Sequence, residues 1–369
     1  MYHKKIQVTT KYTTVFGDLL RHFSKSEFET AISGCFSVIE TEASMKANGN
    51  LLYHFGLKQP IKRSTFCDAL ERRRHDVFRS TFHALVDKAQ GIAGKTKKKF
   101  KDPLRIIDAT IISVCLSRFN WAKYRKSKGA IKLHLNLDGD NLKPLDAYIT
   151  DGKVHDVEQM QNLCQETGVI YALDRGYIDY SSLYTIEKRG SVFVTRVKRN
   201  MKYKKVQNNP HKNDGHILSD VLIELTGLIT KEQYPKQLRK IKYQDPETRK
   251  IYEFLTNDMC REAEEIAAIY KERWQVELFF KWVKQHLKIK SFWGTSMNAV
   301  YSQIWVALIL AILLWINRTL HGITASAYEL LIMLKSTLFT KNSLSGLCTN
   351  IPTPKPYNSL QLFLEGFKC

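Results

Sequence analysis

The stretch between residues 104 and 197 limits the possible fold more than any other feature, because strand-like and helix-like segments succeed one another there in a fixed order. Three strand-like segments come first, and the second and third are joined by Asp-Gly-Asp-Asn at 138–141, a strong hairpin turn. They cover residues 104–116, rich in β-branched side chains, residues 131–137, which alternate polar and apolar, and residues 142–150. Three antiparallel strands are therefore expected.

Two helix–strand pairs are expected after these strands. The first helix covers about residues 157–167 with Asp156 as its N-cap, and a short apolar strand follows at 169–173. A second helix follows its cap Asp179, and a fifth strand covers 191–197. The predicted order is βββ-α-β-α-β.

Two carboxylates stand at marked places in this order. Asp108 lies within the first strand, where an unpaired charge among apolar residues is costly, and Asp174 directly follows the fourth strand. For Asp174 the alternative is a turn aspartate before Gly176, and Asp156 is a rival second carboxylate that helix capping also explains. Strands in this order with carboxylates at these places form an RNase H-like arrangement, so an α/β fold with an RNase H-like core is predicted.

One helix is expected from about residue 261 to 290. At about 100° per residue, four of its polar side chains fall within roughly 60° of one another, on a stripe roughly 21 Å long. They are Tyr270, Arg273, Glu277 and Lys284, and Lys281 lies close to them. A carboxylate among fixed cations suits a metal ion beside a phosphate backbone. The alternative is a solvated helix face with an ion pair such as Glu277 with Lys281.

The remaining segments complete the predicted domain organisation. A small all-helical N-terminal domain is expected first, with a long helix capped by Ser64 whose Arg72, Arg73 and Arg74 make it a candidate DNA reader or an ordinary basic solvated face. A basic, turn-rich stretch with short β-like pieces predicts a β-rich insertion. The predicted boundaries are 1–94 for the helical domain, 99–198 and 258–341 for the two parts of the core, 199–257 for the insertion and 342–369 for a C-terminal tail.

Charge and cysteine usage narrow the possible partners. Lys plus Arg number 57 against 36 for Asp plus Glu, a formal charge of +21, which favours a polyanion such as nucleic acid over a membrane surface. The seven cysteines form no C-x-x-C pair, which argues against a disulfide framework or a zinc site and fits a reducing cytoplasm. The apolar run 304–316 is shorter than the ~20 residues of a membrane span, so a buried core helix is expected.

The spacing Tyr270-x2-Arg273-x3-Glu277-x6-Lys284 resembles the Y-R-E-K signature of the IS-four type of bacterial insertion-sequence transposases. Asp108 in Ile-Ile-Asp-Ala-Thr and Asp174 in Leu-Asp-Arg-Gly-Tyr look like the first two carboxylates of that family, and Glu277 like the third of its DDE triad. Further similar stretches occur at 62–65, 121–122, 128–134 and 294–305, so the resemblance extends from about residue 50 to 335.

The resemblance implies phosphodiester chemistry with two divalent ions, Mg²⁺ or Mn²⁺ as a substitute, held by Asp108, Asp174 and Glu277. It also implies phosphate contacts from the stripe, with Lys281 beside it, and base stacking by Trp274, for which a core aromatic is the alternative. The protein would act in the nucleoid as a homodimer that binds terminal inverted repeats, cleaves at the element ends and joins the 3′-OH to target DNA.

One departure from the family leaves alternatives open. The chain between residues 36 and 51 looks shorter than in the family, so the N-terminal domain is expected to be incomplete. A transposition-defective DNA-binding copy, acting as an inhibitor, is therefore the alternative function, and a host nuclease with this fold is the third. His134 is expected to have a structural role.

Overall fold

The computed structural model describes residues 38–50, 52, 58–92, 98–126, 128–210, 216–287, 289, 291–323 and 325–337. The chain divides into two compact units, one comprising Met1–Lys95 with Val283–Cys369 and the other Thr96–Trp282. The predicted tail and the first 37 residues of the predicted helical domain lie outside the described residues. The grouping differs from the predicted domains in one respect, because the C-terminal helices belong with the N-terminal ones.

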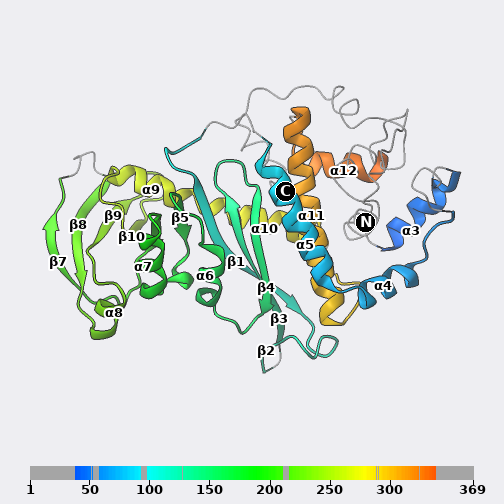
Figure 1. Ribbon diagram of the computed structural model, residues 1–369, viewed down its shortest axis with the longest axis horizontal. Coiled ribbons are helices and arrows are strands. Elements are labelled where there is room, and N and C mark those ends of the chain that lie inside the picture. Colours follow the sequence, from blue (N-terminus) through cyan, green and yellow to red (C-terminus); the bar gives the residue numbers. More distant parts are fainter. Residues whose placement is uncertain are drawn as a thin grey trace, which may run out of the picture. The chain divides into compact units, whose positions relative to one another are not determined.

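The described residues of the Thr96–Trp282 unit form a mixed sheet of ten strands (Figure 1). The strands are β1 (Leu104–Val114), β2 (Lys123–Arg125), β3 (Lys128–Asp138), β4 (Pro144–Asp151), β5 (Ile170–Leu173), β6 (Val192–Arg196), β7 (Tyr203–Asn208), β8 (Ile217–Leu225), β9 (Leu238–Gln244) and β10 (Ile251–Thr256). The five strands predicted between residues 104 and 197 are all present, at β1, β3, β4, β5 and β6.

The first five predicted strands have the expected order and directions. β3 pairs antiparallel with both β1 and β4, while β5 runs parallel to β1 and β6 parallel to β5. The spatial order β4-β3-β1-β5-β6 therefore puts the first strand at the centre, as expected for an RNase H-like core. The predicted turn between the second and third strands is also present, since Leu142 donates its N–H to the Asp138 carbonyl at 2.9 Å.

The predicted insertion is β-rich, but its strands continue the central sheet. β10 pairs antiparallel with β6 from Phe254 to Thr256, and β9, β8 and β7 follow in turn. Without β10, the edge of β6 would present unpaired backbone groups. The insertion therefore extends the central sheet.

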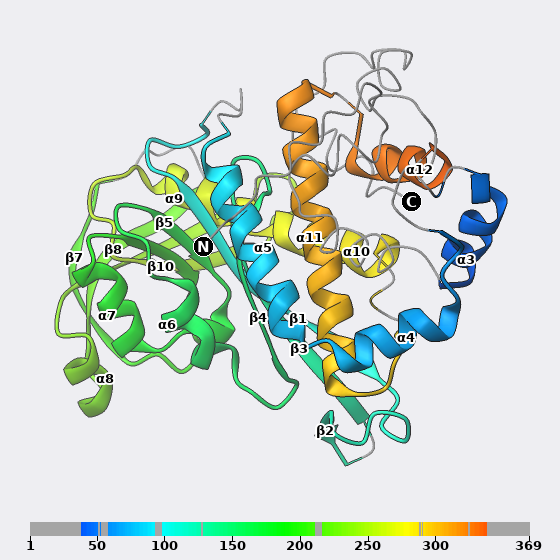
Figure 2. The ribbon, with the colours of Figure 1, turned by 45° about the vertical axis from the view of Figure 1, so that its right-hand side comes forward.

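Helices cover both faces of this sheet (Figures 1 and 2). On one face, α6 (Met160–Leu163) and α7 (Tyr180–Lys188) pack over a core that includes Ile107 and Ala109 of β1. Because side chains alternate along a strand, the intervening Asp108 faces the other side, where α9 (Ala263–Glu272) contacts β5 and β6.

The helix predicted over 157–167 is shorter than expected, and Asp156 is not its N-cap. A 3-10 turn, η2 (Asp156–Gln159), precedes α6, and the preceding His155 occupies the capping position. There the Glu158 carboxylate accepts the His155 backbone N–H at 2.9 Å. The prediction failed because this reciprocal bond moves the start of the helix by one residue, which leaves the Asp156 carboxylate for another partner.

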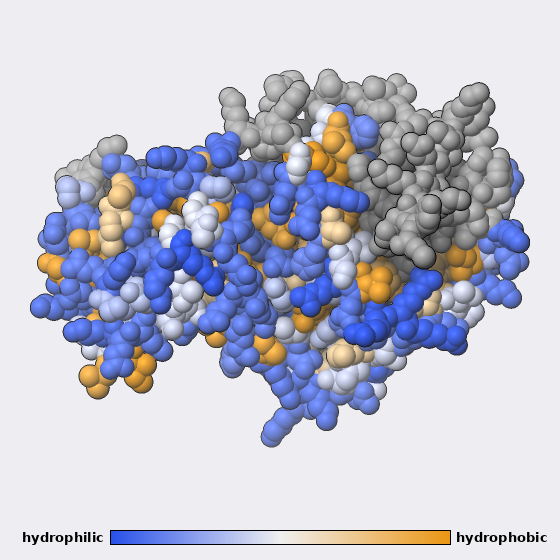
Figure 3. All heavy atoms as spheres, in the orientation of Figure 1, coloured by the Kyte–Doolittle hydropathy of each residue, from blue (hydrophilic) through white to orange (hydrophobic). Residues whose placement is uncertain are grey.

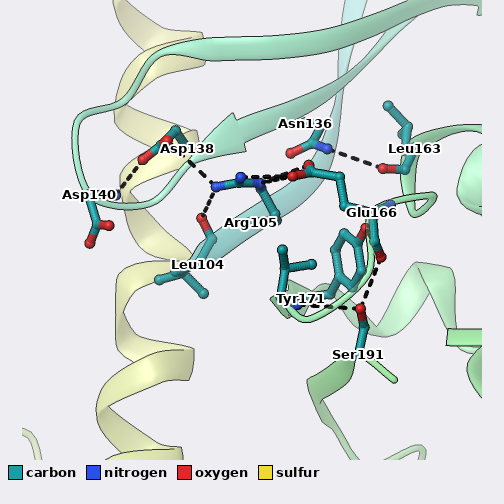
Figure 4. Close-up of polar contacts among 10 residues, drawn as sticks. Leu104, Arg105, Asn136, Asp138, Asp140, Leu163, Glu166, Tyr171 and Ser191 are labelled. Carbon is teal, nitrogen blue, oxygen red and sulfur yellow. Dashed lines mark hydrogen bonds and ion pairs between the residues drawn. The ribbon is translucent and has the colours of Figure 1, made fainter. Parts of the chain in front are cut away.

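Arg105 anchors the beginning of β1 (Figure 4). Its Nε and Nη2 donate to the Glu166 carboxylate, at 2.8 and 2.7 Å for the shortest contacts, and its Nη1 lies 3.5 Å from Asp138. Tyr171 and Ser191 hydrogen-bond the backbone of Glu166, so this acid is held in place. The cluster joins β1 to the segment before β5 and to the end of β3.

The other unit is helical in its described part. It contains α3 (Val38–Ala47), α4 (Arg63–Arg72), α5 (His75–Gln90), the end of α10 (Trp274–His286), α11 (Met297–His321) and α12 (Ala327–Thr337). α4 and α5 both pack against α11. The single helix predicted after Ser64 is wrong, because Arg73 and Arg74 adopt extended backbone angles and separate α4 from α5.

α11 is the buried apolar helix that was predicted, although it is longer than the run at 304–316. Its 25 residues are apolar enough to cross a membrane by length and composition, but 94% of its most apolar window is buried inside the protein. This burial is typical of a core helix. At its start, Asn298 donates to backbone carbonyls of Leu70 and Glu71, and Gln303 accepts the Trp293 N–H at 3.1 Å. Part of the stretch 294–305 therefore holds α4 in place.

The face of the molecule in Figure 3 is mostly hydrophilic. An exception lies over α8 (Leu228–Gln233), where apolar side chains gather at the surface. Leu228 is 89% exposed and Ile229 is 70% exposed. Neither side chain contributes to the core.

Candidate active site

Asp108 lies in the middle of the central strand, between β3 and β5. Its side chain is only 15% exposed, and its Oδ1 accepts the backbone N–H of Ala109 at 2.8 Å. Burial raises the pKa of the Asp108 carboxyl to about 7, although the nearby Arg273 guanidinium acts in the opposite direction. The carboxyl is thus poised to gain or lose a proton near neutral pH.

Asp174 follows β5 immediately, where the chain leaves the sheet. The parallel register pairs Leu173 with Ile107, so the next residue of β5 comes out beside Asp108 on the neighbouring strand. Asp174 caps the 3-10 turn η3 (Arg175–Tyr177), and its Oδ2 accepts the Gly176 N–H at 3.1 Å. Its charge acts together with burial in raising the pKa of the Asp108 carboxyl.

The predicted helix from 261 to 290 is two helices that meet at Arg273. α9 ends at Glu272 and α10 begins at Trp274. At the junction the bonds are tighter than in an α-helix, because Arg273 donates to the Tyr270 carbonyl and Val276 donates to the Arg273 carbonyl, each three residues back. A uniform 100° step therefore does not hold across this point, and the stripe is bent there.

Arg273 bridges two of the three predicted carboxylates. Its Nη1 lies 2.7 Å from Asp108 Oδ2, and its Nη2 lies 2.6 Å from Glu277 Oε1. The guanidinium is 12% exposed and Glu277 is 39% exposed. Burial disfavours the charge of Arg273, but the Asp108 carboxylate and its neighbours outweigh burial and raise the pKa of the guanidinium.

Tyr270 and Trp274 flank this bridge and differ in exposure. The Tyr270 ring packs against Phe254 with 4.9 Å between centroids, and the Arg273 guanidinium lies 5.7 Å from its centroid. Burial raises the pKa of the Tyr270 phenol to about 12, so it stays protonated and able to donate. Trp274 is 58% exposed, which excludes the alternative of a core aromatic.

The other predicted DNA-binding residues lie on α10 and around the end of α4. Lys281 is exposed on α10, and Lys284 is half-buried near the end of that helix, in the other unit. Arg72 ends α4, and Arg73 and Arg74 follow it in the connection to α5. All three arginines are exposed, and Arg74 pairs with Asp76 at 2.6 Å. The prediction that the three arginines lie along the face of one helix is therefore wrong.

The carboxylates of this site are the type of ligand that a hard divalent cation prefers, but their spacing in the structure does not fit such an ion. Carboxylate oxygens are the ligands that Mg²⁺ and Mn²⁺ prefer. Among the described residues, however, no three Asp, Glu, His or Cys side chains are close enough to hold a metal ion as they stand. The Arg273 guanidinium lies between Asp108 and Glu277 and keeps these two carboxylates from meeting at one ion.

A second polar cluster lies beside Asp174 and includes Asp156, the rival second carboxylate of the sequence analysis. Lys132 Nζ lies 2.9 Å from Asp156, whose Oδ2 lies 3.0 Å from where a side chain on Gly176 would begin. His134 is fully buried, with Nε2 2.9 Å from the Thr150 hydroxyl, and burial lowers its pKa to about 4. The alternation of β3 places Lys132 and His134 on one face, and both lie in the family-like stretch 128–134.

Comparisons with known proteins give related matches. A family model described as a transposase DDE domain matches residues 99–314. A putative transposase, y4zB of Sinorhizobium fredii, is 34% identical over 299 residues, which cover 79% of this chain and 80% of that protein. A probable transposase for insertion sequence element IS5377 of Geobacillus stearothermophilus is 33% identical over 222 residues, or 58% of this chain and 57% of that protein.

Among solved structures, the cryo-EM structure of the piggyBac transposase synaptic complex with hairpin DNA covers 95% of this chain and 76% of its own. The TM-score is 0.48 and the sequence identity is 11%.

Proposed function

Because this chain belongs to the family of bacterial insertion-sequence transposases with a DDE domain, we propose that it cleaves DNA at the ends of its own element and joins the freed 3′-OH to target DNA. One observation carries the proposal to specific residues. Arg273 touches Asp108 across 165 residues of sequence and touches Glu277 on the next helix, while Asp174 leaves the strand beside Asp108.

The three carboxylates of the proposed triad are Asp108, Asp174 and Glu277. They would hold two Mg²⁺ ions, or Mn²⁺ as a substitute. When bound, such ions lower the pKa of an attacking water and stabilise the leaving 3′ oxygen. The burial of Asp108 supports its role as a ligand, because a buried carboxylate gains most from neighbouring positive charge.

The cations and aromatics of the Y-R-E-K spacing would bind the DNA strand. Arg273, once released from its carboxylates, would pair with a phosphate near the scissile bond, as would Lys281 and Lys284. The Tyr270 hydroxyl and Arg273 Nε are buried and have no hydrogen-bond partner of standard geometry among the described residues, so either could donate to a phosphate oxygen once Arg273 moves. The exposed Trp274 would stack on an unpaired base at the element end.

The remaining parts of the proposal concern the ends and the assembly. The exposed arginines at 72–74 would contact the terminal inverted repeats, and two copies would bridge two ends in a homodimer. The formal charge of +21 supports a large phosphate-binding surface.

The test uses the purified full chain, a linear duplex that carries the end of its element, and Mg²⁺. The expected product is a strand with a new 3′-OH at the element boundary, followed by a joined product when target DNA is added. Both products are expected to disappear with a chelator and in the variant Asp108→Asn. Cleavage that persists in that variant would rule out the proposed triad.

The alternative of a transposition-defective copy predicts a different result in the same assay. Such a protein would bind the end in a gel-shift experiment and yield neither cleaved nor joined DNA with Mg²⁺ or Mn²⁺.

A further inference from the structure

We propose that Arg261 is a positioning residue for the active site, because it ties the start of α9 to the chain that leads into β1. This inference rests on the proposed function, since it concerns how Asp108 on β1 and Arg273 and Glu277 after α9 reach one another. No part of it requires Arg261 to touch DNA or a metal ion.

Arg261 pairs with acids from two separate segments. Its Nη2 donates to Asp102, two residues before β1, and its Nη1 donates to Asp258, in the loop that follows β10. Its Nε lies 3.4 Å from Glu265, in the first turn of α9. The arginine is 13% exposed, so these contacts are largely shielded from water.

The loop that carries Arg261 is itself fixed to the sheet. Arg239 of β9 makes a buried two-pronged ion pair with Asp220 of β8, and its Nη1 donates to the backbone carbonyl of Arg261 at 2.5 Å. The Asp258 Oδ1 accepts the backbone N–H groups of Cys260 and Arg261 at 2.9 and 3.0 Å. Arg261 therefore has little freedom of its own, and it restrains Asp102.

A second tie joins the same two segments at the other end of α9. Lys99 Nζ lies 2.7 Å from Glu272, the last residue of α9, and the same Glu272 oxygen accepts from Gln275 of α10. Glu272 directly precedes Arg273. The segment before β1 is thus connected to both ends of the helix that leads to the junction.

The spacing of the contacts explains why this matters for the site. From Asp102 to Asp108 there are six residues of extended chain, about 20 Å. From Arg261 to Arg273 there are twelve residues of mainly helical chain, about 18 Å. These two lengths are nearly equal, and an ion pair joins the strand and the helix at each end. Arg261 pairs with Asp102 at one end, and Arg273 pairs with Asp108 at the other. Releasing the first tie loosens the chain that leads into β1, and with it the position of Asp108 relative to Arg273 and Glu277.

The chain offers a matched control in Glu166. The two carboxylates are similarly exposed, 42% for Glu166 and 43% for Asp102, and each pairs with a largely buried arginine. Both pairs lie near the start of β1. Its partner Arg105 connects β1 to β3 and to the segment before β5, and not to α9 (Figure 4). Pairs this exposed contribute little to stability, so Asp102→Asn and Glu166→Gln are both expected to fold.

The experiment measures Mn²⁺ binding by electron paramagnetic resonance on the full chain, together with end cleavage as a function of Mg²⁺. Asp102→Asn is expected to weaken Mn²⁺ binding and to raise the Mg²⁺ needed for half-maximal cleavage, each roughly tenfold. Glu166→Gln is expected to match the wild type in both. Arg261→Lys should fall between the wild type and Arg261→Gln, because one ammonium cannot pair with both acids at once.

Equal metal affinity in Asp102→Asn and Glu166→Gln would overturn the positioning role and leave the proposed function intact, provided that the wild type cleaves. A wild type that neither binds Mn²⁺ nor cleaves would overturn both. Thermal unfolding of each variant separates these outcomes from a loss of folding.

Discussion

Replacing Arg273 by glutamine is expected to increase the affinity of the chain for Mn²⁺ while it reduces DNA cleavage. In the structure the guanidinium lies between Asp108 and Glu277, at 2.7 and 2.6 Å. If the proposed triad holds the metal, a divalent ion that uses both carboxylates would displace the guanidinium. The arginine would then compete with the metal, and it would bind a phosphate only after displacement.

The size of the effect follows from the exposure of the two contacts. The pair with Asp108 is well buried, at 12% and 15% exposed, and a charge-assisted hydrogen bond of this kind contributes about 1.5–3 kcal/mol. Glu277 is 39% exposed, so solvent screening reduces its share to below about 1 kcal/mol. In the wild type, displacing the guanidinium from both carboxylates costs about 2–4 kcal/mol. The glutamine amide retains part of these contacts, so the variant is expected to bind Mn²⁺ roughly 10- to 100-fold more tightly.

The assay is a Mn²⁺ titration followed by electron paramagnetic resonance, at about pH 8.5. This pH is needed because Arg273 lowers the pKa of Asp108, and its removal gives protons an advantage over the metal at neutral pH. Arg105→Gln is the matched control, since Arg105 is 13% exposed and also pairs with carboxylates, but outside the triad. Mn²⁺ binding in Arg273→Gln that is equal to or weaker than in the wild type would refute the competition, and would indicate that the arginine holds the carboxylates ready.

Further predictions concern Trp274, Asp108 and the exposed apolar residues of α8. Trp274→Ala should leave the melting temperature almost unchanged and weaken end binding in a gel shift by about 1–3 kcal/mol, whereas Trp282→Ala, at 1% exposed, should cost about 3–5 kcal/mol of stability in urea unfolding. The pKa of Asp108 is raised to about 7, so Mg²⁺-dependent cleavage should fall as pH drops below 7. The same raised pKa means that the native state holds the Asp108 proton more tightly than the unfolded state, so the stabilising contribution of this group is present below about pH 4 and is lost as pH rises to about 7. Asp108→Asn should therefore gain stability relative to the wild type over that range. Measurements of unfolding against pH would show the opposite trend if the carboxyl were ionised throughout. Leu228→Lys together with Ile229→Lys should shift stability by no more than about 0.5 kcal/mol per site, and a large loss in thermal unfolding would mean that these side chains are covered.

Much of the core was predictable because its signals are local. The β-branched run around Asp108, the hairpin turn at 138–141 and the short apolar strand before Asp174 each depend on consecutive residues, and all three are found as predicted. The resemblance to bacterial insertion-sequence transposases with a DDE domain is confirmed by the transposase matches, while the Y-R-E-K signature around Glu277 stays a prediction. The assignment of the triad itself stays a proposal.

Other predictions failed where a distant or reciprocal contact overrode the local pattern. Ser64 and the residues after it look like the start of one helix, but Asn298 from α11 binds the carbonyls at the end of α4, where the helix stops before Arg73. Asp156 looks like a cap, but Glu158 bonds the His155 N–H and Asp156 pairs with Lys132. Periodicity cannot predict either outcome.

The sequence by itself determined the order of the strands, the places of Asp108 and Asp174 at the centre of the sheet, and the basic charge that suits DNA, because these depend on residue type and on neighbours in the chain. Only the tertiary structure decided that the long helix breaks at Arg273, that its guanidinium lies between Asp108 and Glu277, and that Arg261 restrains Asp102. These contacts join residues up to 165 positions apart. The geometry of these contacts depends on how α9 packs against the sheet, and side-chain periodicity along one segment contains no information about that packing.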